Sequence, residues 1–154
     1  MDVNFSELLS ADCIDLDLKG KKKREIIEEM VAMLVRSGKV RGGQSVVEEL
    51  IEREKEISTG IGKGVAIPHR LIRGIDSSLI GFGRKKTPVN FDALDGSPVD
   101  IFFILLGPEG SANTHLRLLS KLARYLHGDE FLGALRSAQT PREIIDIFVR
   151  EETL

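Results

Sequence analysis

The sequence lacks the features that stabilise a secreted protein or anchor a membrane protein. It has one cysteine, Cys13, so no disulfide can form within the chain and a reducing compartment is expected. Its longest strongly apolar run, residues 101–106, is far shorter than the ~20 residues that a membrane-spanning helix needs. No basic residue precedes Lys19, whereas a secretory leader begins with positive charge. We therefore expect a cytoplasmic protein without direct membrane insertion.

The sequence also lacks an excess of either charge. Lysine and arginine together number 22, and aspartate and glutamate number 24, which gives a net charge of −2. Because DNA and RNA are bound largely through excess positive charge, no nucleic-acid partner is predicted. With 154 residues, of which 42% are hydrophobic and 30% charged, the composition is that of one globular domain. That domain is expected to span residues 1–154.

The hydrophobic pattern predicts strands and helices in a definite order. Period-two alternation or short apolar runs predict strands at residues 13–18, 65–67, 79–82 and 99–106. Apolar residues at three- and four-residue steps predict helices at 26–35, 46–51, 116–126, 129–136 and 141–149. The order is strand, two helices, three strands, three helices. It predicts an α/β fold, a three-layer α/β/α sandwich with a mixed sheet, in which the apolar strand 99–106 is central.

Two of the predicted helices have clear start signals. Ser45 and Glu48 have the spacing of a capping box, in which each side chain hydrogen-bonds an amide group of the first turn. Thr140 and Glu143 have the same spacing, and Pro141 would occupy the first helical position. We expect the helices to begin at these residues.

Three histidines are the candidates for chemistry, although a histidine is more often structural or solvated than catalytic. His69 follows a proline and a glycine-rich turn, whose backbone N–H groups can approach a ligand closely. His115 lies in the first turn of a helix that Asn113 or Thr114 is expected to cap. The positive end of that helix would favour a phosphate beside His115. His127 is expected at the negative end of the same helix.

The sequence predicts neither a metal nor a cofactor. Twelve residues separate His115 from His127, roughly 18 Å along a helix, so the two cannot share an ion. The chain has no cysteine pair and no H-E-x-x-H pattern. The glycine-rich segment 60–64 matches neither nucleotide fingerprint, and it leads into a predicted strand, whereas both fingerprints lead into a helix.

Three segments resemble one protein family. They are residues 58–69 (Ser-Thr-Gly-Ile-Gly-Lys-Gly-Val-Ala-Ile-Pro-His), residues 87–100, and His115-Leu116 with the apolar residues that follow. Together they resemble the enzyme IIA domains of the phosphoenolpyruvate-dependent phosphotransferase system, of the fructose–mannitol type. The resemblance covers nearly the whole chain.

The resemblance implies a phosphoryl carrier with three site residues. The family histidine that accepts a phosphoryl group from the phosphocarrier protein HPr, or from its nitrogen-branch relative, corresponds to His69. A second family histidine, which supports the first, corresponds to His115. The family arginine before the Ser-Thr-Gly turn corresponds to Arg53, which would stabilise the phosphate charge. Arg70 departs from the family, where many members have a small residue, and we expect it to alter local charge and partner preference.

The chemistry of these residues agrees with that role. A neutral imidazole is a competent nucleophile near pH 7. Phosphoryl transfer depends mainly on positioning and charge stabilisation, which backbone N–H groups can supply. The expected phosphate-binding loop consists of Ser58, Thr59, Gly60, Gly62 and Gly64.

Three functions follow from the resemblance. The opening around Phe5 and the segment 87–100 look like the nitrogen-regulatory members, which signal through their phosphorylation state. The alternative is a freestanding fructose- or mannitol-type IIA subunit that passes phosphate to a IIB protein. A second alternative is a non-catalytic interaction module, like the related domains of anion transporters that lack the phosphoacceptor histidine. His69 in its full motif favours a phosphoryl carrier with an HPr-type donor and either a regulatory target or a IIB partner.

Overall fold

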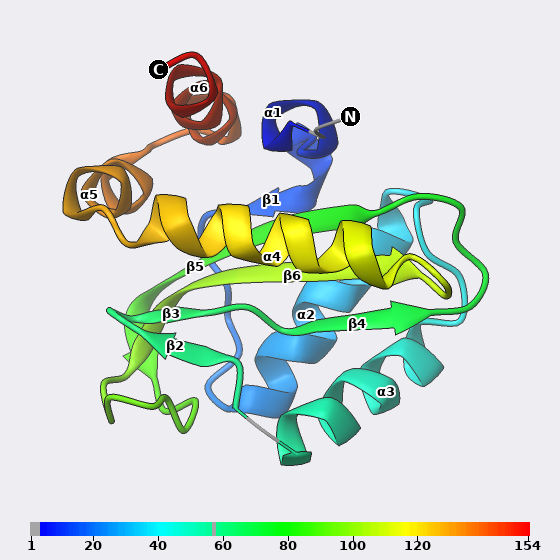
Figure 1. Cartoon of the computed structure of the whole chain (residues 1–154). Helices are drawn as coiled ribbons and strands as arrows, with labels where there is room; N and C mark the ends of the chain where they lie inside the picture. Colours follow the sequence, from blue (N-terminus) through cyan, green and yellow to red (C-terminus); the bar gives the residue numbers. More distant parts are fainter. Residues whose placement is uncertain (1–3, 57) are drawn as a thin grey trace.

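The computed structural model describes residues 4–56 and 58–154. Figure 1 shows its elements. The helices are α1 (Phe5–Leu8), the 3₁₀ helix η1 (Ala11–Cys13), α2 (Lys23–Arg36), α3 (Gly43–Glu56), α4 (Ala112–Leu126), α5 (Asp129–Ser137) and α6 (Pro141–Glu152). The strands are β1 (Ile14–Asp15), β2 (Gly60–Gly62), β3 (Val65–Ala66), β4 (His69–Ile72), β5 (Leu79–Val89) and β6 (Val99–Pro108). Within the described residues, no helix is both long and apolar enough to cross a membrane.

The strands form one mixed sheet around β6. Its order is β1-β5-β6-β3-β2, and β4 also pairs with β6. β5 lies antiparallel along one edge of β6, while β3 and β4 pair in parallel with successive parts of the other edge. The predicted mixed sheet and the central position of strand 99–106 are therefore confirmed.

The side chains of β6 alternate between two hydrophobic cores. Ile101, Phe103 and Leu105 belong to the core formed with α1, α4, α5 and α6. The intervening side chains, from Phe102 to Leu106, belong to the core formed with α2 and α3. Figure 1 shows α4 crossing one face of the sheet and α2 crossing the other. This arrangement confirms the predicted three-layer α/β/α sandwich, because a strand buried on both faces needs helices on both sides.

One of the two predicted capping boxes is wrong. α3 begins at Gly43, before Ser45, and the Ser45 hydroxyl donates a hydrogen bond to the Gly42 carbonyl (2.9 Å). Gly42 has a positive φ of 64°, so the chain turns there and the helix starts earlier than expected. The other box is confirmed in part: the Thr140 hydroxyl accepts a hydrogen bond from the Glu143 N–H (3.2 Å), whereas the Glu143 carboxylate accepts from the Gln139 N–H (2.6 Å).

The helix that contains His115 also begins earlier than predicted. α4 starts at Ala112 with Ser111 in the N-cap position, so neither Asn113 nor Thr114 caps it. The Ser111 hydroxyl donates to the Pro108 carbonyl (2.6 Å) and makes no capping bond. The turn out of β6 is thus closed by Ser111, which places His115 one turn inside the helix.

The strand predicted at residues 13–18 is shorter than expected. Cys13 lies in η1, and β1 consists only of Ile14 and Asp15. The Asp15 carboxylate accepts a hydrogen bond from the Asp17 N–H (2.9 Å), which interrupts the strand, and the chain meets β5 again at Leu18, whose N–H donates to the Arg84 carbonyl (2.9 Å). The alternating pattern is therefore correct for burial but not for strand length.

Two strands were not predicted, so within the described part of the chain the sheet has six strands in place of the expected four. β2 lies in the glycine-rich segment and forms a hairpin with β3. Lys63 and Gly64 both have positive φ in the two-residue turn, as a type I′ hairpin requires. β4 begins directly after Pro68, so His69 is the first residue of this strand.

Two glycines provide a test of how closely helices and sheet are packed. A Cβ atom at Gly83 on β5 would lie 2.5 Å from both Leu18 Cδ1 and Met30 Sδ. We expect Gly83→Ala to lower the free energy of unfolding by about 1–3 kcal/mol through overpacking. Gly133 in α5 has open space at its Cβ position, so Gly133→Ala should raise stability by about 0.4–1 kcal/mol. Urea unfolding measures both, and equal stability of the two variants would contradict the expected contact.

Candidate active site

His69 is held in place by the residues that precede it. The Ile67 N–H donates to the Thr59 carbonyl (2.9 Å), which joins the hairpin to the chain before β4. The Leu105 N–H donates to the Pro68 carbonyl (2.9 Å), which joins the same chain to β6. His69 itself lies opposite Leu105 in the parallel register. These contacts fix the backbone on both sides of the imidazole's attachment point.

One ring nitrogen of His69 is already occupied. Nδ1 lies 2.6 Å from the carbonyl oxygen of Ile67. A carbonyl oxygen only accepts hydrogen bonds, so Nδ1 carries the proton. In the neutral ring, Nε2 then has the free lone pair. The geometry therefore leaves Nε2 as the ring nitrogen that is able to accept a proton or to act as a nucleophile.

His115 is buried and has no hydrogen-bond partner. Its residue is 7% exposed, and both ring nitrogens lie among the buried, unpartnered polar atoms of the described residues. A Cβ atom at Gly107 would lie 3.0 Å from His115 Nδ1, so the glycine leaves room for the ring against β6. A buried polar group without a hydrogen-bond partner costs free energy, so a ligand that hydrogen-bonds this ring would be stabilised by it.

The two imidazoles lie next to each other and are both biased toward the neutral form. Their ring centroids are 5.6 Å apart and their planes are inclined by 45°. Burial lowers the pKa of His69, and the charge of Arg53 lowers it further, against the opposing effects of the Ile67 hydrogen bond and Glu54. Burial, and then the neighbouring His69 and Arg53, lower the pKa of His115 to about 4. Both rings are therefore neutral at pH 7.

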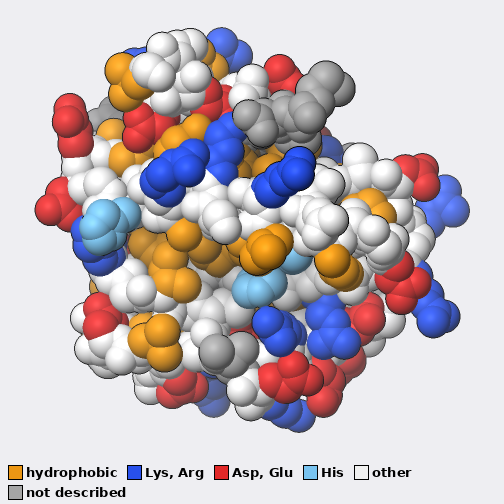
Figure 2. Space-filling model, viewed as in Figure 1, with side chains coloured by type: hydrophobic (Ala, Val, Ile, Leu, Met, Phe, Trp, Pro, Cys, Tyr) orange, Lys and Arg blue, Asp and Glu red, His pale blue; other side chains and the backbone are white. Residues whose placement is uncertain are grey.

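The histidines open into a cleft of about 560 Å³ between α3 and α4. β4 forms its floor. Its lining consists of Arg53, Glu56, His69, Arg70, Leu71, Ala112, His115, Leu116 and Leu119. Figure 2 shows adjoining histidine side chains in the middle of this face, with hydrophobic side chains on one side and Lys or Arg side chains on the other. The cleft thus combines two neutral imidazole rings, positively charged side chains and an apolar rim.

Two arginines contribute that positive charge. Arg53, on the last turns of α3, pairs with Glu56 at 3.2 Å, and its charge acts on both histidines. Arg70 donates through Nη1 to the Glu49 carbonyl (3.1 Å) on α3. The structure therefore brings three predicted site residues, His69, His115 and Arg53, into one cleft.

The glycine-rich segment is placed differently from this group. None of the five residues of the expected phosphate-binding loop is among the described residues that line the cleft. The Thr59 N–H donates to Glu54, and the Gly60 N–H donates to the Ser58 hydroxyl (3.1 Å). At the tip of the hairpin, the Lys63 side chain donates to the His127 carbonyl (2.6 Å) at the far end of α4. A direct role of this loop in phosphate binding stays a prediction.

Glu54 and Gly107 are residues that the sequence reasoning did not single out. Glu54 is 7% exposed and follows Val46, Val47 and Leu50 on the buried side of α3. The position of Glu54 on the same helical face as these apolar residues indicates, in the sequence alone, that its carboxylate is buried. Gly107 offered no such signal, because its importance depends on the ring of His115, which approaches from a different element.

The geometry can be compared with known proteins. Residues 7–151 match the family model described as phosphoenolpyruvate-dependent sugar phosphotransferase system, EIIA 2. The chain is 35% identical over 147 residues to the nitrogen regulatory protein of Pseudomonas aeruginosa, covering 96% of each chain. It is 39% identical over 145 residues to the fructose-specific EIIABC component of Bacillus subtilis. That alignment covers 94% of this chain but only 23% of the larger component.

Solved structures give the same grouping. The crystal structure of the nitrogen regulatory protein IIA-Ntr from Neisseria meningitidis superposes with a TM-score of 0.88 at 38% identity, covering 94% of this chain and 98% of that one. IIA mannitol from Escherichia coli has a TM-score of 0.77 at 20% identity, which is a likeness of fold. With a family model that spans nearly all of its length, the chain belongs to the EIIA 2 family of the phosphoenolpyruvate-dependent sugar phosphotransferase system.

Proposed function

We propose that this protein is a phosphoryl carrier of the nitrogen-regulatory type, which accepts a phosphoryl group on Nε2 of His69 from an HPr-type phosphocarrier. The observation that carries the proposal is the pairing of the two histidines. His69 has its Nδ1 proton bound to the Ile67 carbonyl, and beside it lies the buried His115, whose ring nitrogens have no hydrogen-bond partner among the described residues. A phosphoryl group on His69 would supply oxygen atoms for that unused ring to contact.

The transfer itself needs few groups. The lone pair of His69 Nε2 attacks the phosphorus of the donor's phosphohistidine, a P–N bond forms, and the donor imidazole leaves with the electrons of the old P–N bond. Positive charge at Arg53 and an N–H of neutral His115 stabilise the oxygens during transfer. Arg53 exchanges its exposed contact with Glu56 for the phosphate, which offers two oxygens to a planar guanidinium.

The regulatory role is supported by the whole-length likeness to nitrogen regulatory proteins. The fructose-type alternative also has support, because the fructose-specific component of Bacillus subtilis is 39% identical over its matching part. In both cases phosphorylation adds about −2 charges to the cleft, which changes the surface that a partner meets. The two functions differ in what happens next: a regulator exchanges partners, whereas a sugar carrier passes the group to a IIB protein.

Labelling experiments test the roles of the histidines. With phosphoenolpyruvate, enzyme I and an HPr-type carrier, the protein should gain one acid-labile phosphoryl group, and His69→Ala should gain none. His115→Ala should still be labelled, but about 10²–10³-fold more slowly, because it loses one donor to the transferring group. His127→Ala is the matched control, since this exposed residue lies outside the cleft lining. Unchanged labelling of His69→Ala would refute the assignment.

A transfer assay separates regulation from sugar transport. Phosphorylated protein is mixed with candidate sugar-specific IIB proteins, and loss of label is followed over time. We expect slow or no transfer, together with pull-down of different partners by the phosphorylated protein and by His69→Ala. Fast, stoichiometric transfer to a native IIB protein would establish the fructose- or mannitol-type function instead.

The neutral state of His115 has a consequence for stability. Between pH 6.5 and about 4 the unfolded chain binds a proton at His115, while the folded protein does not. The free energy of unfolding therefore falls as pH is lowered through this range, by up to about 3 kcal/mol from His115 alone. We expect His115→Asn to lose less stability than wild type between pH 7 and pH 4 in urea unfolding. His127→Asn is the control, and an identical loss in His115→Asn and wild type would contradict this prediction.

A further inference from the structure

Glu54 carries a charge in the interior of the protein, directly after Arg53 on α3. Its side chain is 3% exposed, and its carboxylate pairs with Lys23 Nζ at 3.0 Å. Lys23 in turn lies over the ring of Phe91, with its Nζ 4.8 Å from the centroid. A buried carboxylate is costly unless several donors satisfy it, so this arrangement has to be held by further contacts.

Thr59 supplies those contacts from the start of the hairpin. Its N–H donates to Glu54 Oε2 (3.3 Å), and its hydroxyl donates to Glu54 Oε1. Thr59 is 4% exposed. Two bonds from one residue to both carboxylate oxygens fix the position of Thr59 relative to α3.

The contacts continue from Thr59 to the nucleophile. The Thr59 carbonyl accepts the Ile67 N–H (2.9 Å), and the Ile67 carbonyl accepts the proton on Nδ1 of His69 (2.6 Å). Three residues, Glu54, Thr59 and Ile67, therefore connect Lys23 on α2 to the ring of His69. Each link in this series is a hydrogen bond or ion pair between buried or half-buried groups.

We propose that Glu54 and Thr59 are positioning residues for phosphorylation, which hold the Ile67 carbonyl where it fixes the Nδ1–H tautomer of His69. The inference rests on the proposed function, because it explains how Nε2 is kept free for attack. Neither residue lines the cleft, so both act through Ile67 and not on the phosphoryl group.

The series acts by fixing positions and does not carry a proton. The Thr59 N–H and the Thr59 carbonyl belong to different peptide groups, separated by the Cα atom, and the same holds at Ile67. Loss of a link should therefore loosen the Ile67 carbonyl and allow the His69 ring to populate the other tautomer. In that tautomer Nε2 carries the proton and cannot attack, while Nδ1 becomes the nucleophile.

Glu54 also acts on His69 through its charge. Among the groups that face His69, Glu54 raises the pKa of the imidazole, whereas burial and Arg53 lower it. His115 faces the ring of His69 from α4 and is neutral at pH 7. Arg70 follows His69 on β4. Removal of the carboxylate charge is expected to lower the pKa of His69 further, whereas a change at Thr59 leaves that charge in place.

The experiment compares Thr59→Val with Thr59→Ser. Valine matches threonine in shape but has no hydroxyl, whereas serine keeps the hydroxyl. Nitrogen NMR of the unphosphorylated protein reports the tautomer of His69, and phosphorus NMR distinguishes phosphate on Nε2 from phosphate on Nδ1. We expect Thr59→Val to show a mixture of tautomers, some Nδ1 product and an about 10-fold slower phosphorylation, and Thr59→Ser to resemble wild type.

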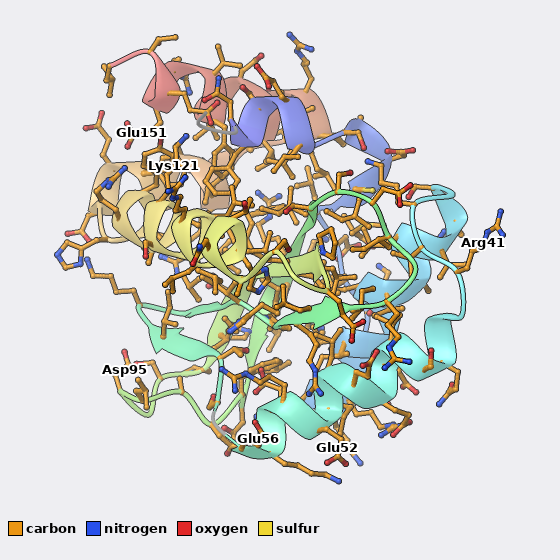
Figure 3. The ribbon with its side chains drawn as sticks, turned by 45° about the vertical axis from the view of Figure 1, so that its right-hand side comes forward. Arg41, Glu52, Glu56, Asp95, Lys121 and Glu151 are labelled. Carbon is orange, nitrogen blue, oxygen red and sulfur yellow. The ribbon has the colours of Figure 1, made fainter. Side chains whose placement is uncertain are left out.

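A second pair of variants tests the carboxylate. Glu54→Gln keeps the shape but removes the charge, and it should lower the pKa of His69 and also disturb the tautomer. Glu52→Gln is the matched control, because Glu52 lies on the outer side of the same helix, where Figure 3 labels it, and contacts only Lys55 (3.4 Å) among the described residues. Glu52→Gln should leave tautomer, pKa and rate unchanged. Thermal unfolding confirms that each variant is folded under the conditions of measurement.

The outcomes separate this inference from the proposed function. If Thr59→Val is folded and retains the wild-type tautomer, the inference is wrong, even where its phosphorylation is slower. If Glu54→Gln does not fold, the Thr59 pair decides alone. The tautomer of His69 is measured without any phosphoryl donor, so failure of wild type to accept phosphate would refute the proposed function and leave the positioning test intact.

Discussion

The whole arrangement depends on β6, an apolar strand that is buried on both faces. Its alternating side chains enter both cores, so its position is fixed by the helices on either side. One edge of β6 sets the register of β4 and places His69 opposite Leu105. The end of the same strand leads through Ser111 into α4, which carries His115 back over the sheet. Two histidines far apart in the sequence therefore meet because both are attached to one strand.

The burial of these two rings side by side costs free energy. His115 has two buried nitrogens without partners, and Arg53 repels a proton on either histidine. This cost suits a phosphoryl carrier, because a dianionic group on His69 would satisfy the unused donor and the arginine at the same moment. A phosphoryl group on His69 would therefore change the site through ordinary electrostatics.

Much of the architecture could be predicted from periodicity, but the catalytic geometry could not. The strand at 99–106, the helix at 141–149 and the sandwich arrangement followed from apolar spacing, because burial on a strand or helix face leaves a regular pattern. The hairpin β2–β3 was missed because glycines hide a strand: Gly60 has no side chain to show a pattern, and its missing Cβ allows Ala93 to approach. β4 was missed because its four residues follow a proline and three of them are only half-buried, with Ile72 alone fully buried.

The candidate site shows the same division. His69, His115 and Arg53 could be named from motifs, and the structure brings them into one cleft. The tautomer of His69 could not be predicted, because it depends on the carbonyl of Ile67, two residues away in the chain, and the N–H of the same Ile67 donates to the distant Thr59 carbonyl. The contribution of Glu54 depends likewise on a contact across a turn. Motifs identify the groups that react, while long-range hydrogen bonds decide which atom of each group does so.

In the proposed function one ring has to accept and to donate a phosphoryl group, and the charges around His69 suit both steps. Burial and Arg53 keep the ring neutral and its lone pair available, whereas the Ile67 hydrogen bond and Glu54 work in the opposite direction. A ring pushed too far toward the neutral form would be a weak nucleophile, because nucleophilicity falls as basicity falls. A ring with a higher pKa would be protonated at pH 7 and could not attack. Burial and the Ile67 hydrogen bond are the largest of the opposing contributions to the pKa of His69, and the charges of Arg53 and Glu54, neighbours on one helix, add to them in opposite directions.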